Sequence, residues 1–350
     1  MPPASPGGDF RSDNTLGASQ EILEALTRAA AGSATSYGTD DITLRLRDRC
    51  REIFGRDAAI FPVITGTAGN ALGVATLTPP WGAVFCHEDA HIHRDELGAV
   101  EFFSGGAKLL GIDTPHAKLT PDAVAARCVT PHDEHSSRPR ALSVTQATEL
   151  GTVYTSAELR ALSDVAHANG MKVHLDGARF ANAVASLGCA PADIAQRAGI
   201  DVMSFGGTKN GMPFGEAIVF FDHALADEFA RRRMQGGQLA SKMRYLAAPW
   251  IAMLESGAWL RHAAHANAMA ARLAQALTAL PGVELIAPVQ ANGVFVHLPK
   301  RAIDALRSRG WLFYVFVGDT GCRFMCAWDT TEAVVDAFAA DVRFAIEAKA

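Results

Sequence analysis

The sequence predicts an α/β protein: a large domain on a mostly parallel central sheet, followed by a smaller α+β domain. Helical and strand patterns alternate along the chain, which is the βαβ rhythm of a parallel sheet covered by helices on both faces. After Asp222 the pattern changes to long, alanine-rich helical stretches that reach about Leu280. We therefore expect a disordered tail at residues 1–10, a large domain at 11–250 and a small domain at 251–350.

Capping and turn residues predict the elements of the large domain. In chain order these are a helix over 40–54 ending at Gly55, a strand over 58–64, a helix opening near Thr67, strands over 83–86 and 100–103, a helix from Thr155 to Gly170, and strands over 171–175, 201–205 and 217–221. Thr155 and Glu158 have the spacing of a capping box, in which each side chain bonds to the other residue's backbone N–H.

The small domain is predicted from short apolar runs separated by glycines. Its expected elements are strands over 283–286, 293–298, 313–317 and 322–327, a helix that ends at Gly310, and a final helix. Cys322 and Cys326 alternate with Phe324 on the last strand, so we expect both thiols in the core rather than in a metal site.

The amino-acid composition indicates which partners and which cellular compartment to expect. The chain has 350 residues, 49% of them hydrophobic, and a formal net charge of −5 without a basic stripe, so neither nucleic acid nor an anionic membrane is expected as partner. No apolar run reaches membrane-spanning length, and the first residues lack a secretory signal. Six cysteines without paired spacing indicate free thiols in a reducing compartment. We therefore expect a cytoplasmic protein.

Residues 87–91, HEDAH, match the zinc-protease motif H-E-x-x-H. The motif binds zinc only on a helix, where two histidines four apart share one face and the glutamate stands beside the metal-bound water. Here it follows the predicted strand 83–86, and Gly98 comes too soon for a third ligand on a continuing helix. A zinc hydrolase stays open as an alternative, but no metal is expected at the main site.

Ligands of open parallel sheets bind beyond the carboxyl ends of the strands, and four such ends carry polar residues. Segment 65–70 passes through glycine into a helix whose N–H groups suit a phosphate. Asp176, Lys209 and His91 follow three other strands. Alone, each has an ordinary explanation, such as a helix cap or a solvated lysine. Together they supply what pyridoxal 5'-phosphate (PLP) requires: a phosphate cradle, an anion for the ring nitrogen, a Schiff-base lysine and a stacking ring.

At these residues the chain resembles the low-specificity L-threonine aldolase family, PLP-dependent enzymes of the aspartate-aminotransferase fold type. The resemblance extends from about Arg11 to the C-terminal helix. It rests on residues 11–14, 37–41, 65–70, 90–91, 174–179, 207–211 and 321–323. RSDN at 11–14 and YGTDD at 37–41 are the more specific motifs. The large domain is thus expected to be an aminotransferase-like PLP-binding domain.

The resemblance implies cofactor contacts for five residues of the large domain. Lys209 would be the catalytic residue that forms the Schiff base with PLP. Asp176 would pair with the pyridine nitrogen, and Gly66 and Thr67 would bind the phosphate. His91 would stack on the ring and, directly or through a water, is the candidate catalytic base for the substrate hydroxyl.

The resemblance also implies a substrate site and shared subunits. Ser12, Arg179 and Arg323 would hold the substrate carboxylate, which suits two guanidinium groups. The substrate-binding Tyr37 and the cofactor-binding Lys242 would reach a neighbouring subunit's site. A homo-oligomer is therefore expected, at least a dimer and by kinship a homotetramer.

The expected reaction is reversible retro-aldol cleavage of L-threonine, L-allo-threonine and related β-hydroxy-α-amino acids to glycine and an aldehyde. One residue departs from the resemblance: Glu149 stands where some family members have a histidine thought to contact the substrate hydroxyl. The alternatives are another PLP-dependent lyase or aminotransferase of the same fold, the zinc hydrolase, and a catalytically silent binding protein.

Overall fold

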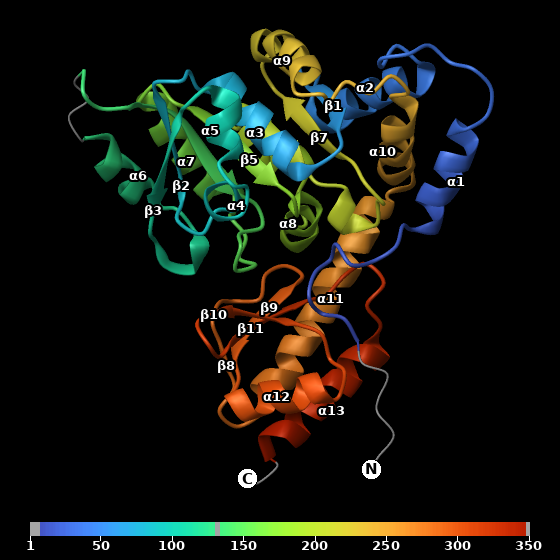
Figure 1. Cartoon of the computed structure of the whole chain (residues 1–350), viewed down its shortest axis with the longest axis vertical. Coiled ribbons are helices and arrows are strands. Elements are labelled where there is room, and N and C mark those ends of the chain that lie inside the picture. Colours follow the sequence, from blue (N-terminus) through green and yellow to red (C-terminus); the bar gives the residue numbers. More distant parts are fainter. Residues whose placement is uncertain (1–7, 130–133, 348–350) are drawn as a thin grey trace.

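The computed structural model describes residues 8–129 and 134–347. It shows a large unit around a central sheet and a smaller unit beside it, connected by the long helix α11 (Ala258–Thr278) (Figure 1). The sheet of the large unit has the strand order β1-β7-β6-β5-β4-β2-β3. The predicted α/β fold class is confirmed.

The central sheet is mostly parallel, as predicted. Its strands are β1 (Ala59–Val63), β2 (Gly82–His87), β3 (Lys108–Ile112), β4 (Arg138–Thr145), β5 (Lys172–Gly177), β6 (Val202–Phe205) and β7 (Glu216–Phe220). The pairs from β3 through β2, β4 and β5 to β6 are parallel, and β7 runs antiparallel to β6 and β1. The carboxyl ends of β1, β2, β4, β5 and β6 therefore lie at one edge.

Helices cover both faces of this sheet (Figure 1). The large unit contains α1 (Gln20–Ala29), α2 (Asp41–Phe54), α3 (Gly66–Leu77), α4 (His91–Arg94), α5 (Ala99–Ser104), α6 (Pro121–Cys128), α7 (Ser156–Ala168), α8 (Phe180–Leu187), α9 (His223–Gln235) and α10 (Arg244–Ser256). Successive strand residues alternate between the faces, so Val84 joins the core with α3, α5 and α9 while Phe85 joins the core with α2, α7 and α8. Among the described residues, no helix has the length and apolar composition needed to cross a membrane.

One predicted strand of the large unit is wrong. Residues 100–103 form part of helix α5, which Gly98 precedes and Gly105 ends, both with positive φ. The aromatic composition indicated a strand, but the structure buries Val100 and Ser104, four residues apart on one helical face, and leaves Phe102 79% exposed. By contrast, the predicted capping box of Thr155 and Glu158 opens α7 as expected.

The small unit is an antiparallel sheet covered by helices. Its elements are β8 (Glu284–Leu285), β9 (Gly293–His297), β10 (Tyr314–Val317), β11 (Gly321–Met325), α12 (Lys300–Ser308) and α13 (Glu332–Glu347). The strand order is β10-β11-β9-β8. Cys322 and Cys326 are buried in its core beside Phe324, so the core position predicted for both thiols is confirmed.

The predicted N-terminal tail and the predicted boundary between the two domains can be compared with the structure. Residues 1–7 of the predicted disordered tail lie outside the described residues. Phe10, however, is 1% exposed and packs against Trp311 and Phe338 in the small unit, because that core buries an aromatic ring from this segment. Disorder is therefore wrong for residues 8–10. The boundary expected after residue 250 falls inside α10, which packs on α1 and α2.

Candidate active site

Two adjoining cavities open at the carboxyl edge of the large sheet. The inner cavity, of about 70 Å³, is lined by residues that follow β1, β2, β4, β5 and β6. The outer cavity, of about 410 Å³, also has walls from β10 and β11 of the small unit. Four side chains line both cavities: His91, Glu149, Arg179 and Lys209. The strand ends that the sequence singled out thus converge.

Lys209 lies in the turn after β6, and its position depends on a glycine. A Cβ atom at Gly206 would overlap the backbone of Ala178, so only glycine lets the loop after β6 lie against the loop after β5. The buried Glu216 carboxylate accepts a hydrogen bond from Gly207 N at 2.8 Å and anchors the same loop. Within the described ranges, the Lys209 ammonium has no hydrogen-bond or ion-pair partner.

Asp176 stands at the carboxyl end of β5 and is 3% exposed. Its Oδ2 accepts a hydrogen bond from Asn70 Nδ2 at 2.8 Å, and its Oδ1 accepts one from Ala178 N at 3.0 Å. Asn70 Nδ2 also donates to Glu96 Oε1 at 2.8 Å. One buried amide therefore holds two carboxylates in fixed positions.

His91 opens α4 and extends this chain of contacts. Its Nδ1 lies 2.8 Å from Glu96 Oε1. That hydrogen bond raises the pKa of His91 above its ordinary value although burial opposes the shift, and the Asp176 carboxylate adds to the increase. The ring is thus held in one orientation by Glu96, and its cationic form is favoured.

Glu149 follows β4, and its side chain lines both cavities. Its Oε1 accepts hydrogen bonds from Thr145 Oγ1 at 2.9 Å and from His91 N at 3.0 Å. Its Oε2 is buried and has no partner among the described residues. Burial, and then the nearby Asp176, raise the pKa of Glu149 to about 7.

Two arginines reach the site from opposite units. Arg179 donates from Nε and Nη2 to Asp13 Oδ2 and Oδ1 at 2.7 and 2.8 Å. Burial alone lowers the pKa of Arg179, but the Asp13 carboxylate outweighs this and raises it. Arg323, on β11, donates to Arg11 O at 3.0 Å. Burial and the charge of Arg179 lower the pKa of Arg323. Ser12 also lines the outer cavity.

The chain is similar to known proteins over most of its length. The family model of the beta-eliminating lyases matches residues 9–300. The low-specificity L-threonine aldolase of Pseudomonas sp. (strain NCIMB 10558) is 49% identical over 97% of this chain and 98% of its own length.

The chain belongs to the threonine aldolase family.

Other members of the family agree in sequence and in structure. The low-specificity L-threonine aldolase of Escherichia coli (strain K12) is 30% identical over 77% of this chain and 79% of its own length. The solved structure of a threonine aldolase from Leishmania major superposes with a TM-score of 0.90, is 28% identical and covers 97% of this chain and 99% of that one. The resemblance drawn from the motifs and the expectation of a lyase are confirmed.

The H-E-x-x-H sequence does not form a zinc motif in this family member. His87 is the last residue of β2 and His91 the first of α4, so the two histidines do not share one helical face. His87 Nε2 lies 2.9 Å from Thr114 O instead. Among the described residues, no group of three His, Cys, Asp or Glu side chains is arranged to hold a metal. The zinc hydrolase alternative is wrong.

Two residues expected at the site lie outside both cavities. Tyr37 is 53% exposed, has a φ of 57°, and donates from its backbone N to Ser241 O at 2.9 Å. Lys242 is exposed and directly follows Ser241 in the chain. The two residues are thus brought together on the surface, and their expected role at a neighbouring subunit's site stays a prediction.

The sequence missed Asn70 and Glu96 as functional residues. Asn70 lies within α3, which is otherwise apolar from Ala71 to Val74, and a buried polar residue in such a helix was an available signal. Glu96 gave no comparable signal, because its partners come from α3 and α4.

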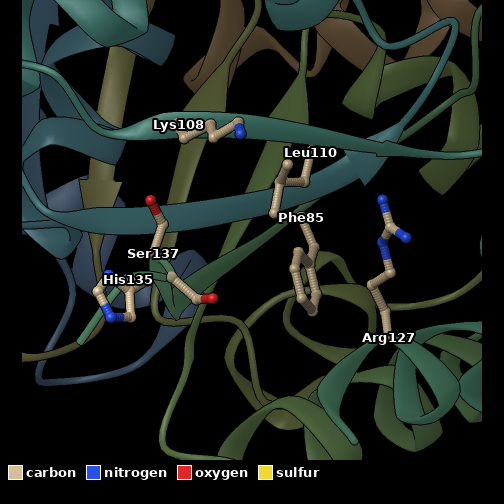
Figure 2. A pocket seen from close by; sticks show the side chains of 7 residues that line it. Phe85, Lys108, Leu110, Arg127, His135 and Ser137 are labelled. Carbon is tan, nitrogen blue, oxygen red and sulfur yellow. The ribbon is translucent and has the colours of Figure 1, made fainter. Parts of the chain in front are cut away.

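A third cavity, of about 300 Å³, lies near the amino ends of β3 and β4 (Figure 2). Its walls include Phe85, Lys108, Arg127, His135 and Ser137. None of the site residues expected from the sequence lies there, although the cavity is larger than the inner one at the other edge.

Proposed function

We propose that this chain is a PLP-dependent L-threonine aldolase. It would cleave L-threonine, L-allo-threonine and related β-hydroxy-α-amino acids reversibly to glycine and an aldehyde. The observation that carries the proposal is the position of Lys209, a lysine without a partner among the described residues, in one cavity with the buried Asp176 carboxylate and Arg179. The 49% identity to a low-specificity L-threonine aldolase supports the same reaction.

The residues present fit PLP. Helix α3 begins at Gly66, where the N–H groups of Gly66 and Thr67 and the helix dipole suit a phosphate, and no atom lies within 4 Å of the place a Gly66 Cβ would take. Asp176, held by Asn70, would pair with the ring nitrogen, and His91 would lie against the ring. Lys209 would hold the cofactor through a Schiff base. When bound, PLP would supply the electron sink that cleavage of the Cα–Cβ bond requires.

The arginines would bind and orient the substrate carboxylate. Arg323 has more donors available than Arg179, because Asp13 already occupies two nitrogens of Arg179. The buried Nε of Arg323 has no partner in the described part of the chain. We therefore assign Arg323 the main contact with the carboxylate, with Arg179 and Ser12 beside it.

His91 is better suited to holding the ring than to accepting a proton. Its Nδ1 is occupied by Glu96, and its raised pKa favours the protonated form. The Glu96 contact fixes the orientation of the ring, which suits contact with a flat cofactor. The proposed role of His91 is therefore contact with the cofactor.

We further propose a homo-oligomer, a dimer at least and a tetramer by kinship. The exposed Tyr37 and Lys242 lie near each other outside their own site, which supports a contribution to a partner's site. Mixing the variants Lys209→Ala and Lys242→Ala under conditions that exchange subunits tests this. A mixed dimer contains one site with both lysines intact, so activity should exceed that of either variant alone; no gain on mixing would contradict shared sites.

The proposed location is the cytoplasm. All six cysteines lie in the described part of the chain and are free thiols, which supports a reducing compartment.

Product analysis tests the proposed reaction. The protein supplied with PLP should convert L-threonine to glycine and acetaldehyde in equal amounts. Release of a keto acid would instead indicate elimination or transamination by a related enzyme of this fold. Absence of turnover with every β-hydroxy amino acid tried would indicate a silent binding protein.

A further inference from the structure

Glu149 lines both cavities of the site. The residues proposed to bind PLP and the substrate carboxylate do not include it. We propose that Glu149 is the catalytic base that takes the proton from the β-hydroxyl of the substrate. The inference rests on the proposed aldolase function and deepens it by naming the residue that starts the bond cleavage.

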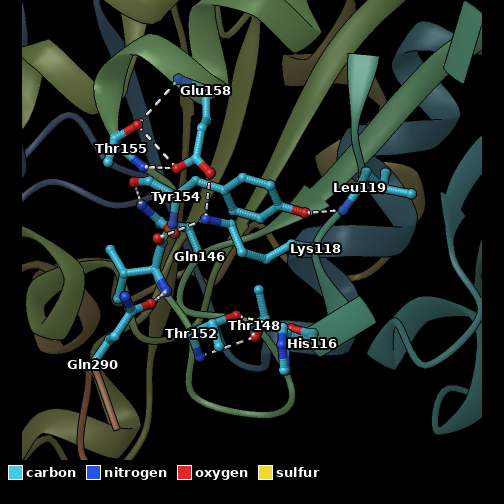
Figure 3. A network of polar contacts seen from close by, with 11 residues as sticks. His116, Lys118, Leu119, Gln146, Thr148, Thr152, Tyr154, Thr155, Glu158 and Gln290 are labelled. Carbon is cyan, nitrogen blue, oxygen red and sulfur yellow. Dashed lines mark hydrogen bonds and ion pairs between the residues drawn. The ribbon is translucent and has the colours of Figure 1, made fainter. Parts of the chain in front are cut away.

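A network of hydrogen bonds braces the segment from Gln146 to Thr155, to which Glu149 belongs; Figure 3 shows this network. Gln146 and Tyr154 exchange side chain to backbone hydrogen bonds of 2.8 and 2.9 Å across the loop. Thr148 N donates to Thr152 O at 2.9 Å inside it. Tyr154 Oη accepts from Leu119 N at 2.5 Å.

The small unit also contacts this loop. Val153 N donates to Gln290 Oε1 at 2.8 Å (Figure 3). Both units therefore brace the segment from 146 to 155. A side chain on such a loop is preorganised, which a catalytic carboxylate requires.

One oxygen of the Glu149 carboxylate is available to accept a hydrogen bond. Thr145 and His91 N occupy Oε1, whereas Oε2 is buried with no partner in the described part of the chain. A buried polar atom of this kind calls for a partner, and an ionised carboxylate can only accept. A substrate hydroxyl is a donor of the required type.

The surroundings of Glu149 suit a base at neutral pH. Burial and Asp176 disfavour its ionised form and place its pKa at about 7, where a general base is most effective. The other charged or titratable groups around it come from several elements: His91 on α4, Asp95 and Glu96 after α4, Asp176 on β5, Arg179 after β5, Lys209 after β6, Tyr314 on β10, Arg323 on β11, Cys86 on β2 and Tyr154 before α7.

The proposed cleavage step conserves protons and electrons. The hydroxyl proton passes to the Glu149 carboxylate as the C–O bond becomes the C=O of the aldehyde. The Cα–Cβ bond breaks, and its electron pair remains on the glycine side. A proton then returns to Cα, so glycine and aldehyde form without net consumption of a proton.

The variant Glu149→Gln tests the proposal, with glycine as the second substrate. Glycine has no β-hydroxyl, so exchange of its α-proton in D2O does not need this base. We expect Glu149→Gln to lower kcat for threonine cleavage by roughly 100-fold or more, and to leave glycine exchange within about 2-fold of the parent protein. The fall of kcat/KM below about pH 7 should disappear in the variant.

The control is Glu284→Gln, the same change at an exposed residue of β8 outside both cavities. It should keep both reactions and the pH profile. Threonine cleavage at the parent rate in Glu149→Gln would overturn the proposal, and so would equal loss of cleavage and glycine exchange, which indicates a structural role. Failure of the parent protein itself in both reactions would instead reject the proposed function.

Discussion

The two edges of the large sheet both have cavities, but the polar groups that line them in the described residues are held differently. At the carboxyl edge, the buried carboxylates Asp176 and Glu96 both accept hydrogen bonds from the buried Asn70 amide, and the half-buried His91 contacts Glu96. At the amino edge, basic side chains such as Lys108 and Arg127 lie exposed around a cavity of about 300 Å³. Volume and charge alone therefore do not identify the site; buried polar groups in mutual contact do.

Replacing a lysine at each edge should give the largest difference in aldolase activity. Lys209→Ala should abolish aldehyde release from threonine, because no other lysine of the described residues lines the inner or outer cavity. Lys108→Ala at the amino edge is the matched control and should keep full activity. A Lys209→Ala protein that still turns over threonine would reject the PLP assignment.

Replacing an arginine at each edge should give a smaller difference in kcat/KM. Arg323→Ala removes a charged hydrogen-bonding partner of the substrate carboxylate, so kcat/KM for threonine should fall roughly 10- to 100-fold. Arg127→Ala, at the amino-edge cavity, is the control. Steady-state kinetics with unchanged kcat/KM for Arg323→Ala would shift the main carboxylate contact to Arg179.

The network at the carboxyl edge should also be visible in stability. Asn70→Ala leaves Asp176 and Glu96 without a shared donor, so the free energy of unfolding should fall by about 3 kcal/mol. Asn182→Ala removes a buried asparagine bonded to the neutral Asn267 and should cost only about 1 kcal/mol. Denaturant unfolding compares the two, and equal losses would mean that Asn70 does not stabilise the carboxylates specially.

Substitutions confined to the amino edge should have the smallest effect on stability and activity. The double variant Lys108→Ala and Arg127→Ala changes only exposed side chains, so the free energy of unfolding should stay within about 0.5 kcal/mol. Its kcat/KM should also match that of the parent. A large loss of activity would show that this edge contributes to the site.

The parts of the site that the sequence predicted are those that follow strand ends. Lys209, Asp176 and His91 each come shortly after an apolar run or at its end, and parallel strands bring such positions to one edge. The motifs then distinguished them from ordinary caps. The same reasoning predicted the strands of the large sheet from residue 58 onward, except β3 and β4.

The contacts between these residues could not be predicted in the same way. Asp13 and Arg179 are 166 positions apart, and their pairing depends on how the N-terminal segment crosses the site. Glu96 and Asn70 are 26 positions apart, and Glu96 stands just before a turn at Leu97 and Gly98, both with positive φ. The free Oε2 of Glu149 likewise follows from tertiary packing, not from a local pattern.

The visible absorption spectrum tests the central claim most directly. The protein supplied with PLP should show a visible band that Lys209→Ala loses or shifts, and glycine should produce a further band at longer wavelength. That result would establish the cofactor, the linkage to Lys209 and binding of the glycine product together. A protein that remains without a visible band after PLP is supplied would contradict the account.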